Sequence, residues 1–355
     1  MKKLEQLRSM LKEKNADAIF INSPANRQYL TGFTGTAGAV LITQEQAFFI
    51  TDFRYIEQAK SQCEGFEIIE QTSSVLKSLQ KKSEELKWNR LAFEKNHLTY
   101  ASFEQLRAHT EAELLPVEGL VEEIRLYKNK DELAVIQQAV DIADRAFEHI
   151  TTYIEPGRKE IEVSNELEFF MREQGAVSSS FDIIVASGTR SALPHGVATE
   201  KEIESGDLVT LDFGAYFQGY CSDITRTVAV GEPSNELKRI YQTVYEAQWK
   251  AVEEIKPGMT GVEADAIARE HITKAGFGRS FGHGLGHGLG MEVHEGPRLS
   301  PKGEHTLEPG MVVTVEPGIY VPGVGGTRIE DDIVITDKGN ERLSQSPKEL
   351  MIIGK

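Results

Sequence analysis

Two kinds of hydrophobic pattern alternate along the first third of the chain. Leu4, Leu7 and Leu11 recur at the spacing of an amphipathic helix. Residues 17–22, DAIFIN, instead form a short apolar run of the length that strands have. Alternation of helices and strands predicts an α/β layer with a mixed sheet. The predicted helices are 2–14, 53–62 and 73–86, and the predicted strands are 17–22, a hairpin at 38–50, and 90–94.

A long helical pattern, KNKDELAVIQQAVDIADRAFEHI, starts at Lys128 and opens the rest of the chain. No low-complexity linker precedes it, so we place a boundary between residues 120 and 128 and expect domains at 1–122 and 123–355. Each half of the second domain has two helical segments and strands joined by short turns. This predicts an α+β domain with an antiparallel or mixed, curved sheet, preceded by a smaller α/β domain.

The second domain contains an internal repeat. Residues 203–216, IESGDLVTLDFGAY, return as residues 307–320, LEPGMVVTVEPGIY. In the same way, IEPG at 154–157 returns as IKPG at 255–258. A period of about 100 residues is too long for a solenoid. It predicts two similar lobes that close on one site.

The repeat places a carboxylate at matched points of a predicted strand, Asp212 in one half and Glu316 in the other. After a glycine-rich turn each half adds a second carboxylate, Asp223 and Glu330. Buried carboxylates are costly unless they are paired or bind a metal, and four of them close together repel strongly. We favour a dinuclear metal site over a structural ion-pair network, because bridging carboxylates offset two divalent charges. The cations available to an ion-pair network are Arg226 and Arg328.

Three histidines, His283, His287 and His294, lie in the glycine-rich segment FGHGLGHGLGMEVHEGPR at residues 281–298. Glycines on both sides would let the backbone come close to a ligand. The spacing matches neither a phosphate-binding loop nor the H-E-x-x-H zinc helix. His195 holds in the first half roughly the place of His294 in the second. We interpret these histidines as functional.

A site of four carboxylates and an imidazole is rich in oxygen ligands, which suits hard to borderline divalent ions. We expect two such ions, Mn²⁺ above all, with Co²⁺, Zn²⁺ or Fe²⁺ as alternatives. A pair of ions of this kind holds a bridging hydroxide nucleophile and polarises a carbonyl or phosphoryl oxygen. Neighbouring histidines would then stabilise the developing oxyanion and handle protons.

Composition narrows the partners and the compartment. The 355 residues carry a formal net charge of −16 and no basic stripe, which argues against nucleic acid or an anionic membrane as a partner. The N-terminal segment lacks the apolar core of a signal peptide, and no run is long enough to predict a membrane span. The two cysteines, Cys63 and Cys221, suit a reducing compartment, so we expect a cytoplasmic protein. They could pair, and Cys221 lies near Asp223, but oxygen donors are the better metal ligands here.

At these residues the chain resembles the pita-bread metallopeptidases of the Xaa-Pro branch, prolidase and aminopeptidase P. The segments at 26–38, 51–59 and 181–196 extend the resemblance to a creatinase-type N-terminal domain and over nearly the whole chain. It implies a pita-bread catalytic domain with an internal pseudo-two-fold repeat. The motifs that carry it are LDFG with Asp212, CSDITRT with Asp223, GHGLGH with His287, VEPG with Glu316 and TRIED with Glu330.

The resemblance implies a role for each candidate residue. Asp212 and Asp223 bind one metal ion with Glu330 bridging, and His287 and Glu316 complete the other. Glu316 also resembles a carboxylate that handles protons. The other implied roles are an oxyanion donor for His294, substrate pocket or proton relay for His195 and His283, support of the metal carboxylates for Arg328, and pocket walls for Phe181 and Tyr320, which could equally be core residues.

The resemblance also implies hydrolysis of the bond before proline, in Xaa-Pro dipeptides or at the N-termini of short peptides. That bond lacks an amide N–H and has restricted geometry. Arg298 resembles an arginine with which some prolidases hold the free carboxylate of a dipeptide. As a surface arginine it would leave room for longer peptides, as in aminopeptidase P. We favour the dipeptidase, and the family implies a homodimer. The alternatives are methionine aminopeptidase, creatinase and a non-catalytic peptide-binding relative.

Overall fold

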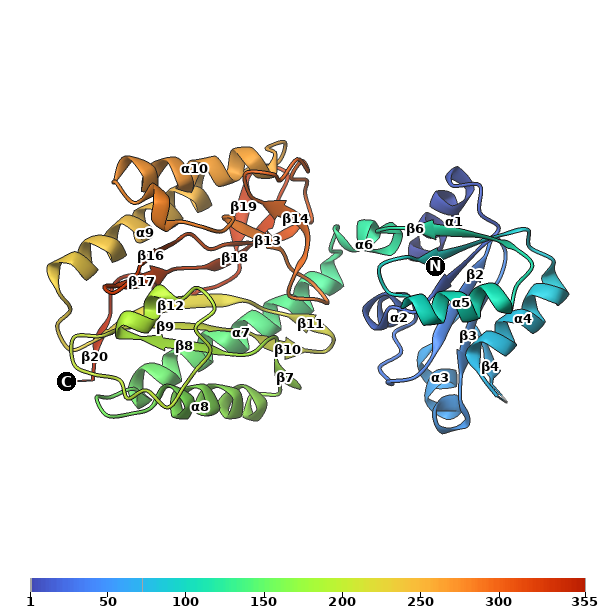
Figure 1. The fold of residues 1–355 in the computed structure, drawn as a ribbon, viewed down its shortest axis with the longest axis horizontal. Helices are drawn as coiled ribbons and strands as arrows, with labels where there is room; N and C mark the ends of the chain where they lie inside the picture. Colours follow the sequence, from blue (N-terminus) through green and yellow to red (C-terminus); the bar gives the residue numbers. More distant parts are fainter. Residues whose placement is uncertain (1, 72, 355) are drawn as a thin grey trace. The chain divides into compact units, whose positions relative to one another are not determined.

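The computed structural model describes residues 2–71 and 73–354. The chain divides into two compact units, Met1–Arg125 and Leu126–Lys355 (Figure 1). The division falls inside the range of 120–128 in which the sequence placed a boundary.

The first unit is built on one six-stranded sheet with the order β4-β3-β2-β1-β5-β6. The pairs β1–β2 and β2–β3 are antiparallel and the others are parallel, as a mixed sheet requires. Leu7 and Leu11 of α1 are fully buried, as their spacing predicted. The strands are β1 (Ala18–Ile21), β2 (Ala39–Thr43), β3 (Ala47–Thr51), β4 (Glu67–Glu70), β5 (Arg90–Glu94) and β6 (Glu113–Val117). The helices are α1 (Lys2–Glu13), α2 (Pro24–Thr31), the 3₁₀ turn Phe53–Tyr55, α3 (Ile56–Gln62), α4 (Val75–Leu86), α5 (Tyr100–Ala108) and α6 (Leu120–Arg125).

The sequence did not predict α2, β4, α5, β6 or α6. The two missed strands are the edges of the sheet. β4 reads EIIE with no fully buried residue, and β6 reads ELLPV with Pro116 inside it. Edge strands tolerate proline and polar residues, so they lack a strong apolar signal.

In the second unit, the predicted repeat forms two copies of one helix pair. The first copy is α7 (Lys130–Tyr153) with α8 (Glu160–Glu173), and the second is α9 (Asn235–Glu254) with α10 (Gly261–Lys274). The turn inside each pair holds a glycine at positive φ, Gly157 at 91° and Gly258 at 88°. Residues with a side chain rarely adopt this conformation. The IEPG and IKPG segments therefore form matching turns.

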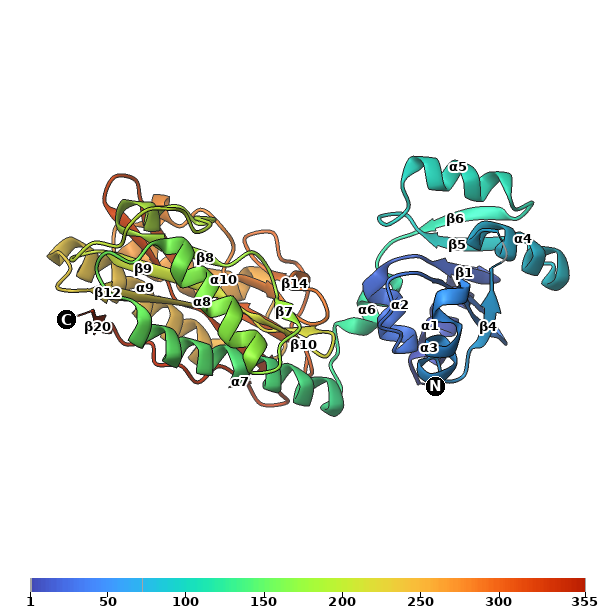
Figure 2. The ribbon, with the colours of Figure 1, turned by 90° about the horizontal axis from the view of Figure 1, so that it is seen from below.

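The strands of the second unit are duplicated as well. One sheet has the order β20-β12-β9-β8 and the other β14-β13-β15-β18-β19, so the antiparallel run β8-β9-β12 matches β13-β15-β18. Helices α7 and α8 lie on one side of these strands, and α9 and α10 on the other (Figures 1 and 2). The strands are β8 (Ile184–Ser187), β9 (Leu208–Phe213), β12 (Ile224–Val230), β13 (Gly286–Gly288), β14 (Glu295–Leu299), β15 (Val312–Val315), β18 (Asp331–Ile335), β19 (Asn340–Arg342) and β20 (Ile352–Ile353). Two smaller sheets contain β7 (Ser178–Ser179) with β10 (Ala215–Phe217) and β11 (Tyr220–Cys221), and β16 (Gly318–Val321) with β17 (Gly325–Arg328).

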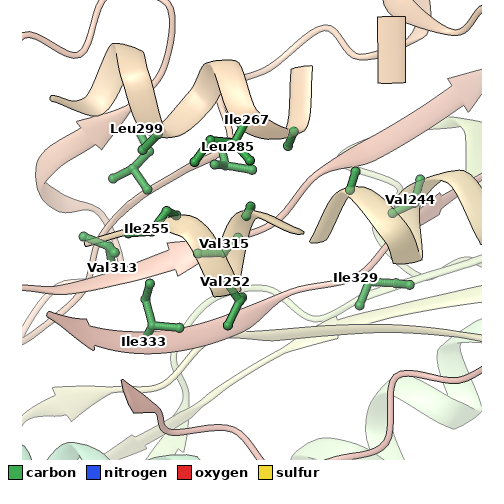
Figure 3. Close-up of a cluster of buried hydrophobic side chains, with 14 of the residues drawn as sticks. Val244, Val252, Ile255, Ile267, Leu285, Leu299, Val313, Val315, Ile329 and Ile333 are labelled. Carbon is green, nitrogen blue, oxygen red and sulfur yellow. The ribbon is translucent and has the colours of Figure 1, made fainter. Parts of the chain in front are cut away.

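Aliphatic side chains hold each helix pair on its sheet. In the second half, Val252 of α9 and Ile267 of α10 share one buried cluster with Val313 and Ile333 of the strands (Figure 3). Each such side chain contributes roughly 1.5–3 kcal/mol when it is fully buried. The cluster fixes the strands whose ends carry the acidic residues.

A buried ionic network lies beside these strands. Asp331 is fully buried and accepts from Arg226 Nη2 at 2.7 Å, Lys348 Nζ at 2.8 Å and Gln248 Nε2 at 2.9 Å. Burial alone would raise the pKa of Asp331, but the charges of Arg226 and Lys348 lower that pKa below its usual value. Arg226 thus pairs with Asp331. Among the four residues with candidate carboxylates, Arg226 donates only to Glu330, and there to the backbone carbonyl.

Replacing Asp331 with alanine should lower the free energy of unfolding by about 3–5 kcal/mol, because Arg226 and Lys348 would stay buried without their partner. The pKa of Asp331 is lower in the folded than in the unfolded chain. Its contribution is therefore present above about pH 4 and is lost as the pH falls further. Urea unfolding of the variant and the wild type at pH 7 and at pH 3 measures both effects. The exposed Asp337→Ala variant is the control, and a loss under about 1 kcal/mol at pH 7 would contradict the prediction.

Candidate metal centre

The four repeated carboxylates lie at strand ends in the middle of the second unit. Asp212 is the fifth residue of β9, and Asp223 comes directly before β12. In the other half Glu316 directly follows β15, and Glu330 directly precedes β18. The halves are joined here, since Thr225 Oγ1 donates to Glu330 Oε2 at 2.6 Å. The hairpins of the repeat thus carry their acidic residues to one place.

His287 of β13 joins this group. Its Nε2 lies 3.3 Å from Glu316 Oε1 and 3.7 Å from Asp223 Oδ2. One ligand atom from each of Asp223, His287 and Glu330 lies within 4.8 Å of the others. The other ring nitrogen, Nδ1, is 3.0 Å from the Gly288 carbonyl oxygen. If Nδ1 carries the proton and donates to this carbonyl, Nε2 is left as the lone-pair nitrogen that faces the carboxylates.

The electrostatics of the group favour binding of a cation. Asp212 Oδ1, Asp223 Oδ1 and Glu330 Oε1 are buried and have no hydrogen-bond partner within the described part of the chain. Burial, and then repulsion from neighbouring carboxylates, raises the pKa of Asp223 and of Glu330. Burial also raises the pKa of Glu316 to about 7 and lowers that of His287 to about 4. Buried carboxylate oxygens without partners and a neutral imidazole are the donor set that divalent metal ions bind, so these residues fit the predicted metals.

The ion-pair alternative does not neutralise the group. Arg328 of β17 donates to Asp212 Oδ2, to the Tyr320 hydroxyl at 2.7 Å and to the Pro194 carbonyl at 3.1 Å. It is the one arginine or lysine side chain that pairs with any of the four carboxylates among the described residues. Arg328 therefore holds Asp212 in place, and the other three carboxylates have no arginine or lysine partner among the described residues.

The sequence suggested that the glycines around His287 let the backbone approach a ligand. In the structure they instead allow close packing of neighbouring strands. A Cβ on Gly286 would lie 2.0 Å from the Thr314 carbonyl oxygen, and one on Gly288 would lie 1.7 Å from that of Gly296. These contacts are with the backbone on either side of β13. The glycines thus let β13 fit between β15 and β14, which fixes the position of His287.

A pocket of about 610 Å³ opens over the carboxylates. Its wall holds a histidine, His294, that is exposed as a residue but has a ring partly covered by that of His287, which it meets edge-on with centroids 4.4 Å apart. Burial, and then the charge of Arg298, lowers the pKa of His294. The other predicted residues that line the pocket are Phe181, His195, His283, Arg298 and Arg328.

Tyr320 is not among the residues that line the pocket. It is buried behind the wall, where its hydroxyl lies 2.9 Å from His283 Nε2 and accepts from Arg328. Burial lowers the pKa of His283 to about 4. Tyr320 therefore supports two residues of the wall and is placed as a core residue.

Other contributors to the site were not predicted from the sequence. Asp182 and Val197 also line the pocket, and Asp332 Oδ2 accepts from the backbone N–H of Asp223 at 3.0 Å. The signal for Asp182 was its place directly after Phe181. Cys221 is a free, buried thiol whose pKa burial raises to about 12, and it lies outside the group of ligand atoms formed by Asp223, His287 and Glu330.

Two known protein families match this chain, one in each unit. Residues 134–337 match the model of metallopeptidase family M24, and residues 3–127 match that of the creatinase/prolidase N-terminal domain. The chain belongs to metallopeptidase family M24. The pita-bread fold, the creatinase-type first domain and the assignment as a peptidase are thereby confirmed.

Several relatives match this M24 chain along nearly its full length. The uncharacterized peptidase YqhT of Bacillus subtilis is 58% identical over 352 residues, covering 99% of this chain and all of that one. The solved structure of an Xaa-Pro dipeptidase from Bacillus anthracis is 57% identical, with a TM-score of 0.98 over 99% of both chains. That of an X-Pro aminopeptidase from Thermotoga maritima is 40% identical, with a TM-score of 0.91 over 96% of this chain and 98% of that one. Across residues 2–71 and 73–354, every helix falls short of the length or apolar character that crossing a membrane requires.

Proposed function

We propose that this M24 protein hydrolyses the peptide bond before proline, with two divalent ions held by Asp212, Asp223, His287, Glu316 and Glu330. The observation that carries the proposal is the set of buried carboxylate oxygens without partners at the floor of a pocket. The resemblance to an Xaa-Pro dipeptidase over 99% of the chain supports the choice of bond.

Bound divalent ions would polarise the scissile carbonyl and lower the pKa of an attacking water. Glu316 stands beside His287, with its Oε1 3.3 Å from Nε2, where a carboxylate could take up a proton from the attacking water and return it to the leaving nitrogen. His294 projects from the wall over the same floor. It would donate to the oxyanion that forms when the carbonyl is attacked.

We further propose a preference for dipeptides. Arg298 is exposed in the pocket wall, and within the described residues its guanidinium has no hydrogen bond or ion pair. A free guanidinium is suited to bind the carboxylate that ends an Xaa-Pro dipeptide. The proposal also includes Mn²⁺ as the ion, a cytoplasmic location and a homodimer. Metal analysis and light scattering of the purified protein test the ion and the dimer.

The substrate preference is tested with Met-Pro and Met-Pro-Gly, each in the presence of Mn²⁺ and of a chelator. We expect kcat/KM to favour the dipeptide by at least about tenfold, a difference of about 1.4 kcal/mol. In Arg298→Ala this preference should disappear through a rise in KM for the dipeptide, because a binding contact has been removed.

The exposed Arg279→Ala variant is the matched control and should keep the wild-type preference. Faster cleavage of the tripeptide by the wild type would make the protein an aminopeptidase P. It would also remove the carboxylate role of Arg298. Cleavage of neither peptide with Mn²⁺ would overturn the proposed substrate class.

A further inference from the structure

The pocket contains one acidic side chain that the proposed metal site does not use. Asp182 lines the pocket and is exposed, whereas Asp212, Asp223 and Glu330 on the floor are buried. Within the described residues, the Asp182 carboxylate has no hydrogen bond or ion pair. The Asp182 carboxylate is thus available to bind a cationic group of a molecule that enters the pocket.

The backbone explains why Asp182 faces the pocket. Ile184 pairs with Asp212 across β8 and β9, and the Ser180 N–H donates to the Gly214 carbonyl at 2.8 Å. The stretch 180–184 therefore lies opposite the shorter stretch 212–214, so it bulges from the ladder. Bulges of this kind redirect side chains and occur beside active sites.

The internal repeat gives the same placement independently. Asp182 precedes His283 by the same number of residues that separates Gly175 from Gly276, which both have positive φ. His283 lines the pocket from the second half, as Asp182 does from the first. The two residues thus hold matching positions in the two lobes.

We propose, on the basis of the proposed function, that Asp182 binds the cationic side chain of the residue before proline. The preferred substrates would then be Lys-Pro and Arg-Pro dipeptides. The α-ammonium group is only two bonds, about 2.5 Å, from the scissile carbonyl carbon, so we assign it to the buried floor and the side chain to the exposed Asp182. It stays near the buried floor, while a lysine side chain extends on the order of 6 Å further toward the exposed wall.

The pocket wall also offers apolar surface for the aliphatic part of such a side chain. Ile184 and Val197 form a bridge beside Asp212, and both line the pocket. Val197 is 50% exposed. Lysine and arginine bury their methylene groups along apolar surface while the charged end reaches a polar partner. Arg298 lies on β14, which belongs to the other sheet, so the two ends of the substrate would meet opposite charges.

The test compares kcat/KM for Lys-Pro, Met-Pro and Glu-Pro with the full-length, Mn²⁺-loaded enzyme. We expect the wild type to favour Lys-Pro over Met-Pro by about fivefold, the effect of a partly exposed charge pair. In Asp182→Asn the ratio should fall to about one, and in Asp182→Lys the enzyme should favour Glu-Pro over Lys-Pro. The control Glu204→Gln removes an exposed acidic residue outside the pocket and should keep the wild-type ratio.

The outcomes separate this inference from the proposed function. An unchanged Lys-Pro to Met-Pro ratio in Asp182→Asn, or no inversion in a folded Asp182→Lys, would overturn the inference alone. Equal losses for all three dipeptides would also overturn it, because Asp182 would then hold the α-ammonium group or the loop. If the wild type cleaved none of the dipeptides, the proposed function would fail and this inference with it.

Discussion

Replacing Asp223 with asparagine is expected to lower kcat/KM for an Xaa-Pro dipeptide by more than about a thousandfold. Asp223 has a ligand atom within 4.8 Å of those of His287 and Glu330, so it sits where the proposed ions would bind. The amide keeps the size of the carboxylate but lacks its charge, which is what holds a hard divalent cation. Purified variant should carry less metal than wild type, and adding Mn²⁺ should restore little activity.

The same variant should be more stable than the wild type when metal is removed. Burial and the charge of Glu330 raise the pKa of Asp223 in the folded protein. An acid with a raised folded pKa costs stability once the pH exceeds its unfolded value of about 3.9, and the full cost is present above the folded pKa. Asparagine avoids this cost. With Mn²⁺ the order should reverse, because ligand at 100 times its Kd stabilises the native wild type by about 2.7 kcal/mol.

Thermal unfolding with chelator and with Mn²⁺ shows whether this reversal occurs. Asp337→Asn, a change of the same kind at an exposed position, should follow the wild type in both conditions. An Asp223→Asn protein that is less stable than wild type with chelator would mean that the carboxylate is structural. Activity within tenfold of wild type would refute the metal site itself.

The repeated sequence made the arrangement of the site predictable. Asp212 and Glu316 stand at matched points of IESGDLVTLDFGAY and LEPGMVVTVEPGIY, and both fall at the ends of buried strands. Two copies of one hairpin that face each other bring their acidic residues together. Strand alternation and the repeat therefore predict four carboxylates close together, and all four line one pocket.

What the sequence could not show are contacts between segments whose pairing has no local pattern. Arg226 and Arg328 both looked like partners for the acidic residues, but Arg226 is held by Asp331 in a separate network. Tyr320 looked like a pocket wall, yet its hydroxyl is directed at Arg328 and His283 behind that wall. Such roles depend on which face of a strand meets which neighbour.

Replacing His294 with alanine should lower kcat by about 100- to 1000-fold while metal content and KM stay near their wild-type values. A donor to the developing oxyanion acts in the transition state and hardly at all on the bound substrate. Loss of such a donor therefore lowers kcat and kcat/KM together. His305→Ala, an exposed histidine outside the pocket, is the control.

The measurement that decides the role of His294 is the metal content of the variant. Its ring meets His287 edge-on, with centroids 4.4 Å apart, so it could instead act by fixing the ring of that proposed ligand. In that case His294→Ala would lose metal, and excess Mn²⁺ would restore much of kcat. A donor to the oxyanion gives the opposite result, since metal is retained and no concentration of Mn²⁺ restores the rate. Rescue by Mn²⁺ would thus show that His294 positions His287 and does not act on the oxyanion.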